Sequence, residues 1–207
     1  MTTLLPPALI LAGGRSSRMG TDKASLAFGS RTLLAHVLER LEPQASEVAV
    51  NAPASLQLPP GVRRVPDTLP DQPGPLAGVL AGIRDAAGRG SAATHLLTVP
   101  SDAPFFPSDL TGRLMSATPD PDAVAIASSA RQSHPVFGLW PLSLANELED
   151  WLADGRNRRM FSFLERHRVV TVEWDLLPTE FGPVDPFMNL NTPADLEAAR
   201  RFLEIAP

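Results

Sequence analysis

The sequence predicts an α/β fold in which a mostly parallel central sheet lies between layers of helices. Short apolar runs alternate with amphipathic stretches along the whole chain, which is the order of a βαβ protein. Several of these runs are apolar at nearly every position, as is typical of strands that are buried on both faces. A length of 207 residues with 43% hydrophobic content suits one domain over residues 1–207, built around a single core.

The first half of the chain begins with a predicted strand over residues 8–12, which ends at two glycines. A helix is predicted over 32–41, because Leu33, Val37 and Leu41 fall on one helical stripe together with their apolar neighbours. The other elements predicted in this half are strands over 47–50, 62–65 and 95–99 and a helix over 76–87. Gly78 and Gly82 interrupt that helix pattern, and we expect them to permit close packing.

The second half continues the alternation. Next comes a helix that starts with Ser108 or a neighbour near its cap. The remaining elements are strands over 123–127, 136–140 and 169–174 and helices over 143–153, 161–166 and 193–203. The last helix has the clearest start, with Thr192 as N-cap and Asp195 three residues later. In the helix before it we expect Phe161, Phe163 and Leu164 to pack inward.

Parallel α/β sheets bind ligands beyond the carboxyl ends of their strands. In this chain that rule points to three loops, at residues 13–23, 67–78 and 100–104. The candidate functional site is therefore predicted where these three loops meet.

The first of these loops carries the only lysine of the chain, Lys23, whereas the seventeen other strong bases are arginines. A lysine retained beside a glycine loop indicates a need for a compact ammonium group on a flexible stem. Gly13 and Gly14 let the backbone approach a phosphate closely, and Arg18 adds positive charge. The loop matches neither a Walker motif nor a dinucleotide fingerprint, but its pattern predicts a triphosphate site.

Composition excludes several kinds of function. A net charge of -5 and a pI near 5.3 argue against a broad nucleic-acid surface. The absence of cysteine excludes disulfides, thiolate metal sites and cysteine nucleophiles. The start of the chain does not read as a signal peptide, and no apolar run reaches membrane-spanning length, so we expect a cytoplasmic protein without a membrane partner.

Several motifs together resemble a known family. They are LAGGRSSRMGTDK at 11–23, PGPLAG at 73–78, SDAPF at 101–105 and NLNTPADLE at 189–197. In this order they are similar to the molybdenum cofactor guanylyltransferases, within the wider nucleotidyltransferase superfamily. Relatives that use CTP or make sugar nucleotides commonly have LAAG in place of LAGG. The resemblance covers nearly the full length, and it implies a three-layer, Rossmann-like sandwich of the nucleotide-diphospho-sugar transferase type.

The resemblance also implies roles for particular residues. It implies backbone contacts from Leu11, Ala12 and Gly13 to the nucleotide, phosphate contacts from Lys23, and contacts to base or ribose from Asn51 and Asp67. Asp102 would bind Mg²⁺. Because this aspartate directly follows a predicted buried strand in a chain without thiolates, it also suits Mg²⁺ on chemical grounds, although a turn role stays open. Arg18, Lys23 and Mg²⁺ on Asp102 would offset charge on the leaving group.

Two further sets of residues are candidates for the second substrate. Arg156, Arg158 and Arg159 lie in a basic run that either binds an anion or forms a solvated surface. Asn189 and Asn191 lie two apart, so in an extended segment their side chains face the same way, toward a ligand or in local capping. His134, which precedes a proline, has no carboxylate at a spacing that would indicate catalysis, and its role is left open.

The function that the resemblance implies is transfer of GMP from GTP to the phosphate of molybdenum–molybdopterin, with release of pyrophosphate. Molybdenum cofactor carriers or recipient molybdoenzymes would be protein partners. A phosphate monoester is already an anionic nucleophile, so catalysis needs alignment and charge neutralisation rather than a general base. The alternatives are a cytidylyltransferase for the same cofactor, a sugar-phosphate nucleotidyltransferase, or a noncatalytic GTP-binding protein that handles the cofactor.

Overall fold

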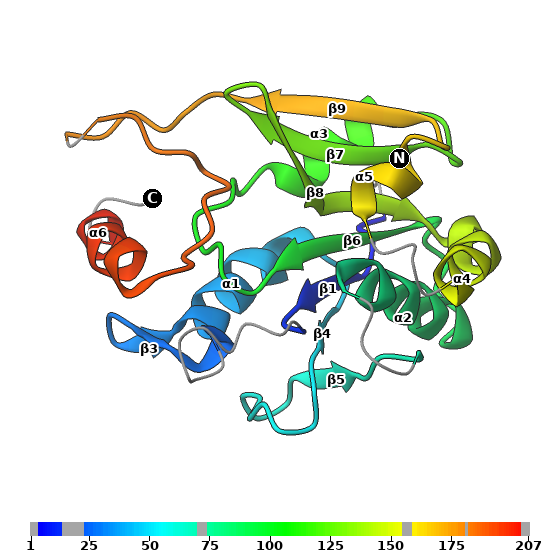
Figure 1. The fold of residues 1–207 in the computed structure, drawn as a ribbon, viewed down its shortest axis with the longest axis horizontal. Helices are drawn as coiled ribbons and strands as arrows, with labels where there is room; N and C mark the ends of the chain where they lie inside the picture. The colour runs from blue at the N-terminus through cyan, green and yellow to red at the C-terminus, as the bar shows by residue number, and fades with distance from the viewer. Residues whose placement is uncertain (1–3, 14–22, 70–73, 155–158, 181, 204–207) are drawn as a thin grey trace.

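A seven-stranded sheet forms the centre of the protein in a computed structural model, which describes residues 4–13, 23–69, 74–154, 159–180 and 182–203 (Figure 1). The strand order is β5-β4-β1-β6-β8-β7-β9. The strands are β1 (Ala8–Leu11), β4 (Val48–Asn51), β5 (Arg63–Val65), β6 (His95–Pro100), β7 (Val124–Ser129), β8 (Gln132–Pro141) and β9 (Val169–Trp174). Only β8 runs antiparallel to its neighbours in this sheet, β6 and β7. The predicted mostly parallel sheet is confirmed.

Helices cover both faces of this sheet. They are α1 (Leu33–Leu41), α2 (Pro75–Gly88), α3 (Leu110–Ala117), α4 (Ala145–Ala153), α5 (Met160–Leu164) and α6 (Pro193–Leu203). Alternate residues of β1 point to opposite faces. Ile10 packs in one core with residues of α1 and α3, and Leu9 packs in the other with residues of α2, α4 and α5. This explains why the predicted strands are apolar at nearly every position.

A smaller cluster lies outside these two cores. The two-stranded sheet of β2 (Ala27–Phe28) and β3 (Arg31–Thr32) contributes Phe28, which packs with Phe105 and with residues of α6. Figure 1 shows α6 at the edge of the molecule, beside this small sheet. The chain before α6 therefore has to cross the carboxyl edge of the main sheet to reach its place.

Two glycines of α2 allow it to lie close to the sheet. A Cβ at Gly78 would lie 2.5 Å from the Oδ1 atom of Asn51, and one at Gly82 would lie 2.6 Å from Leu9 and Leu96. Such distances are shorter than a side chain tolerates, so the prediction that these glycines permit close packing is confirmed.

The start of α6 is also confirmed. The hydroxyl of Thr192 accepts a hydrogen bond from the backbone N–H of Asp195 at 3.1 Å, and the Asp195 carboxylate accepts one from the N–H of Thr192 at 2.8 Å. This is a reciprocal capping box.

Two expectations were incomplete or wrong. The side chain of Phe161 is 52% exposed, whereas Phe163 and Leu164 are buried as expected. The strand predicted over 136–140 begins earlier, at Gln132. The prediction missed this start because the turn before it contains no glycine, proline or asparagine, the residues that usually indicate a turn. The cap of α3 is confirmed, because Asp109, the neighbour of Ser108, takes the N-cap position. Its carboxylate makes no cap hydrogen bond and accepts from the indole N–H of Trp174 instead. No helix in the described ranges is long and apolar enough to cross a membrane.

Candidate active site

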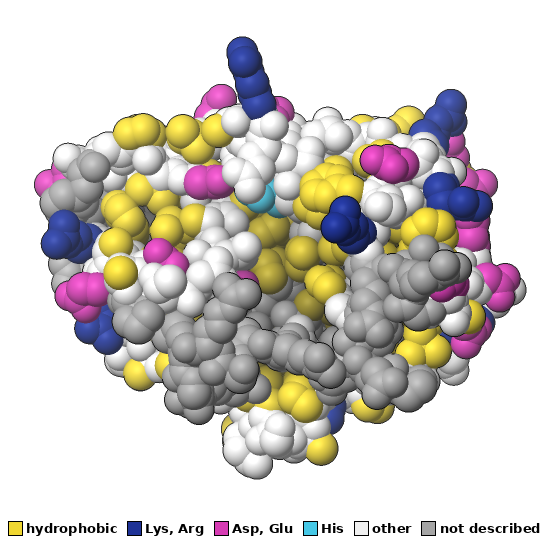
Figure 2. All heavy atoms as spheres, in the orientation of Figure 1, with side chains coloured by type: hydrophobic (Ala, Val, Ile, Leu, Met, Phe, Trp, Pro, Cys, Tyr) yellow, Lys and Arg dark blue, Asp and Glu magenta, His cyan; other side chains and the backbone are white. Residues whose placement is uncertain are grey.

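A cavity of about 330 Å³ opens at the carboxyl ends of β1 and β6. Gly13, Pro75 and Asp102 all line it, so each of the three loops predicted from the sequence contributes to its wall. Figure 2 shows this side of the molecule hollowed near its centre, with hydrophobic side chains in the floor. In the main sheet β1 lies between β4, the next strand along the chain, and β6, a later one, so the strand order reverses at β1. Ligands of open α/β sheets bind at such a switch point.

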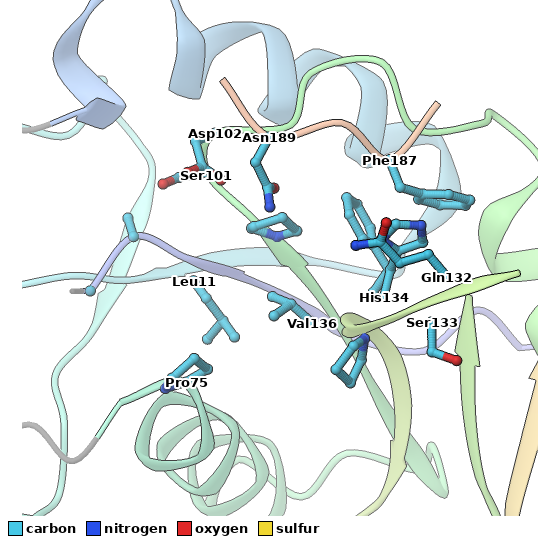
Figure 3. A pocket seen from close by; sticks show the side chains of 15 residues that line it. Leu11, Pro75, Ser101, Asp102, Gln132, Ser133, His134, Val136, Phe187 and Asn189 are labelled. Atoms are coloured by element: carbon cyan, nitrogen blue, oxygen red, sulfur yellow. The ribbon is translucent and has the colours of Figure 1, made fainter. Parts of the chain in front are cut away.

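Asp102 and Ser101 form one end of the cavity, directly after β6 (Figure 3). The backbone N–H of Ser101 donates to the carbonyl of Leu11 at 3.1 Å, which extends the pairing of β1 and β6 beyond the strands. The backbone carbonyl of Asp102 accepts from the N–H of Leu190 at 2.8 Å. These bonds fix the end of β6 and tie the segment before α6 to it. Asn189, which precedes Leu190, consequently reaches the cavity wall.

The donor set at this end fits Mg²⁺. Among the described residues, no three His, Cys, Asp or Glu side chains come together as a metal-binding group. Asp102 is half-buried and supplies the one carboxylate of the cavity wall within the described ranges. A single carboxylate is insufficient for a cage built from protein alone, but Mg²⁺ commonly takes one or two carboxylates and completes its shell with phosphate oxygens and water.

Asn51 and Asp67 lie together on the opposite side of β1. The Asn51 amide donates to the Val65 carbonyl at 3.1 Å and to the Asp67 carboxylate at 2.8 Å, and Asn51 is only 4% exposed. Both amide hydrogens are thus used within the protein. A Cβ at Gly13 would lie 3.4 Å from the remaining Oδ1 atom. The pair therefore joins the end of β4 to the end of β5 and the loop after it, close to Gly13.

The opposite end of the cavity is made by the β7–β8 hairpin. Ile126 of β7 pairs with Gly138, but the next residue, Ala127, pairs with His134, so residues 135–137 form a bulge in β8. All three bulge residues line the cavity. Bulges of this kind re-aim side chains next to active sites, and a proline is tolerated there because it does not have to donate to the ladder.

The turn of this hairpin has an unusual backbone. Ala130 and Arg131 have φ values of 47° and 66°, in a region that favours glycine or asparagine. Glu173 of β9 holds this turn, because its carboxylate accepts from the Arg131 N–H at 3.3 Å and from the Ser128 hydroxyl. These hydrogen bonds also lower the pKa of Glu173, so the carboxylate stays ionised under the turn.

Beneath the same end of the cavity lies a cluster that the sequence did not reveal. The Ser129 hydroxyl is 2.7 Å from Nε2 of His134 and 2.7 Å from Oδ1 of Asp185. The Asp185 carboxylate also accepts from the backbone N–H of Phe187 at 2.8 Å. Asp185 lies 56 residues after Ser129, on a different segment, so no local spacing could have indicated the carboxylate next to His134.

The other candidates divide into described and undescribed residues. Lys23 begins a 3₁₀ turn (Lys23–Ser25), but its side chain lies outside the described part, as do Arg18, Arg156 and Arg158. Arg159 is exposed before α5 and does not line the cavity. Asn189 lines it, whereas Asn191 is exposed and its backbone N–H donates to Asp195 at 2.9 Å. The structure thus places one asparagine of the pair on the wall, not both.

Comparison with known proteins agrees with this geometry. Residues 8–169 match the model of the MobA-like NTP transferase domain. A molybdenum cofactor guanylyltransferase of Sinorhizobium fredii is 48% identical over 199 residues, which are 95% of this chain and 91% of the relative. One from Rhizobium johnstonii is 50% identical over 196 residues, covering 95% of this chain and 92% of the relative.

Solved structures show the same fold at low identity. The molybdopterin-guanine dinucleotide biosynthesis protein A of Archaeoglobus fulgidus superposes with a TM-score of 0.71 at 20% identity, covering 96% of this chain and 99% of that one. The 4-diphosphocytidyl-2C-methyl-D-erythritol synthase of Anaerococcus prevotii gives 0.67 at 13% identity, with 97% and 99% covered. The fold is that of nucleotidyltransferases, and the sequence identity to the rhizobial relatives identifies the family within that fold. The chain belongs to the molybdenum cofactor guanylyltransferase family of MobA-like NTP transferases.

Proposed function

We propose that this protein transfers GMP from GTP to the terminal phosphate of molybdenum–molybdopterin and releases pyrophosphate. An oxygen of the acceptor phosphate attacks the α-phosphorus of GTP, and the bond between that phosphorus and the oxygen of the β-phosphate breaks. The product carries a new diphosphate link between the pterin and the guanosine. The names of the rhizobial relatives, together with their near full-length similarity to this chain, support this assignment.

The nucleotide belongs at the glycine turn. Leu11, the last residue of β1, lines the cavity together with Ala12 and Gly13, which follow the strand. Lys23 and Arg18 would meet the phosphates from the adjoining loop. The Asn51–Asp67 pair would contact base or ribose through the Asp67 carboxylate and the Asn51 Oδ1 atom, because the Asn51 amide hydrogens are already used.

Asp102, which lines the cavity just after β6, would hold Mg²⁺. When bound, the ion would neutralise phosphate charge and would help to orient the triphosphate. The residues of the chain supply alignment: the ends of β1 and β6 are fixed to each other through Ser101 and Leu11, so nucleotide and acceptor can meet in a defined geometry.

The observation that carries the proposal is the cavity at the switch point, which has Asp102 and the glycine turn at one end and a hydrogen-bonding wall of neutral side chains at the other. The two ends thus differ in charge, and we expect the triphosphate near the first and an uncharged part of the acceptor near the second.

Pyrophosphate release, measured with GTP or CTP in the presence and absence of molybdenum–molybdopterin, tests this function. We expect release only with GTP and the acceptor together. Preference for CTP would make the protein a cytidylyltransferase, and GTP binding without release would make it a noncatalytic handling protein. Repeating the measurement with EDTA and restoring Mg²⁺ afterwards tests the metal.

A further inference from the structure

A hydrogen-bonded relay of three side chains, Asp185, Ser129 and His134, lies at the cavity end that is remote from Asp102. Its members come from three parts of the fold: the end of β7, the start of β8, and the segment before α6. Figure 3 shows His134 beside Gln132 and Phe187, with Asp102 and Ser101 at the other end. The His134 ring lies 5.0 Å from the Phe187 ring, and its side chain is only 11% exposed. The imidazole is consequently held in place rather than free to turn.

The hydrogen bonds determine which nitrogen of His134 carries the hydrogen. Ser129 has a single hydroxyl hydrogen, and the Asp185 carboxylate can only accept, so that hydrogen points to Asp185. The Ser129 oxygen must then accept from Nε2 of His134. A neutral imidazole has one N–H, which leaves a lone pair on Nδ1. The relay thus fixes the tautomer with Nδ1 as a hydrogen-bond acceptor.

The Nδ1 atom has no hydrogen-bond partner within the described part of the chain, although His134 lines the cavity. Burial lowers the pKa of His134, and the nearby carboxylates of Asp185 and Glu173 only partly oppose this effect. The ring is therefore neutral at neutral pH. The neighbouring side chain of Gln132 is also uncharged (Figure 3). A phosphate, which offers only lone pairs when ionised, would meet another lone pair at Nδ1.

We propose that His134 determines specificity for the second substrate, by accepting at Nδ1 a hydrogen bond from an N–H group on an uncharged heterocyclic part of the acceptor. This inference rests on the proposed function, because that function supplies an acceptor with such a ring. Ser129 and Asp185 are positioning residues that act through His134. The acceptor's phosphate would extend the other way, toward the glycine turn and Asp102.

Steady-state kinetics of pyrophosphate release tests the assignment. In His134→Phe we expect the KM for molybdenum–molybdopterin to rise about tenfold, the size of one lost hydrogen bond, while the KM for GTP stays unchanged. His134→Asn, whose carbonyl oxygen can take the place of Nδ1, should recover part of the loss. Ser129→Ala should raise the same KM less, because Nδ1 then carries the lone pair only part of the time.

His167→Phe is a matched control. His167 is also buried against a phenylalanine, with ring centroids 4.3 Å apart, and its side chain is 9% exposed, but it does not line the cavity. We expect both KM values of this variant to equal those of the wild type. If His134→Phe and His167→Phe behave alike, the proposed role of His134 is overturned. Thermal melting of each variant shows whether it is folded, and His134→Asn and Ser129→Ala decide the case if His134→Phe does not fold.

The pH dependence of the acceptor KM shows which protonation state of His134 binds the acceptor. The neutral imidazole is the form that accepts, so the acceptor KM should rise as the pH falls through the lowered pKa of His134, below its ordinary value of 6.5. The charged groups that act on this pKa are Asp185, on the segment before α6, and Glu173, on β9. If His134 bound phosphate as an imidazolium, the KM would instead fall with falling pH. That result would overturn the proposal.

A third measurement does not depend on turnover. Long-range ¹H–¹⁵N NMR of the wild-type protein should show the hydrogen of His134 on Nε2, and Ser129→Ala should shift the signals toward a mixture of tautomers. A hydrogen on Nδ1 in the wild type would overturn the proposal. A wild type that releases no pyrophosphate would sink the proposed function instead, since the tautomer is read independently of activity.

Discussion

The two ends of the cavity are built in different ways. The end at the glycine turn comes from residues that directly follow parallel strands, such as Gly13 after β1 and Ser101–Asp102 after β6. The opposite end comes from an antiparallel hairpin, a bulge and a segment that returns from β9 toward α6. Local sequence therefore specifies the first end, whereas the second depends on contacts between distant residues. The following variants test this difference, from the largest expected effect to the smallest.

Lys23→Ala should have the largest effect, because it removes the ammonium group that we expect at the triphosphate. We expect guanylyl transfer to fall by about a hundredfold or more, as is common when one preorganised charge on a reacting group is lost. The melting temperature should stay close to that of the wild type. Lys23→Arg should restore only part of the activity, since a planar guanidinium does not replace a compact ammonium. A folded Lys23→Ala variant with wild-type turnover would contradict the role of the glycine loop.

Gly78→Ala should destabilise the first end through packing. The new methyl group would lie 2.5 Å from Oδ1 of Asn51 and 2.6 Å from Leu11, so the amide that bonds Val65 and Asp67 has to move. We expect a loss of about 1–3 kcal/mol in the free energy of unfolding. Gly88→Ala is the control, because no atom lies within 4 Å of a Cβ there. Urea denaturation of both variants measures the difference, and equal stabilities would contradict the close approach.

Thr98→Val tests the hydrogen bonds that hold the β8 bulge at the hairpin end of the cavity. The Thr98 hydroxyl donates to the Val136 carbonyl in the bulge at 2.7 Å and accepts from the Trp140 indole N–H at 3.0 Å, and Thr98 is fully buried. Valine keeps the shape but leaves both groups unpaired, which should cost about 1–3 kcal/mol. Thr68→Val is the control, because Thr68 is exposed and lies outside the helices and strands. Thr192 is also exposed but is unsuitable as a control, since its hydroxyl caps α6. Chemical denaturation with no loss of stability for Thr98→Val would argue against this network.

The double variant Ala130→Asn with Arg131→Gly should have the smallest effect, and a stabilising one. Both positions have positive φ, which Asn-Gly adopts at lower cost than Ala-Arg. We expect a gain of about 0.5–1 kcal/mol, visible as a higher melting temperature. A lower melting temperature would show that the native side chains make contacts that outweigh the strain.

Much of the fold could be predicted from the sequence because its signals are local. The buried run of β1, the stripe of Leu33, Val37 and Leu41, and the capping box at Thr192 each act within a few residues. The start of β8 could not be predicted, since Ala130 and Arg131 give no turn signal and are held in place by Glu173, far along the chain. The exposure of Phe161 was also missed, because a helix of five residues is too short for the spacing of its apolar residues to show which face is buried.

By itself, the sequence determined the α/β class, the order of the elements, and the end of the cavity where motifs follow strands, including Asp102 and the glycine turn. The tertiary structure alone decided that Asn51 gives its amide hydrogens to Val65 and Asp67, and that only Asn189 of the asparagine pair reaches the cavity wall. It also brought Asp185 to Ser129 and His134. The physical reason is that a strand end or helix cap is specified by neighbouring residues, whereas a hydrogen-bonded relay forms only after distant segments have packed together.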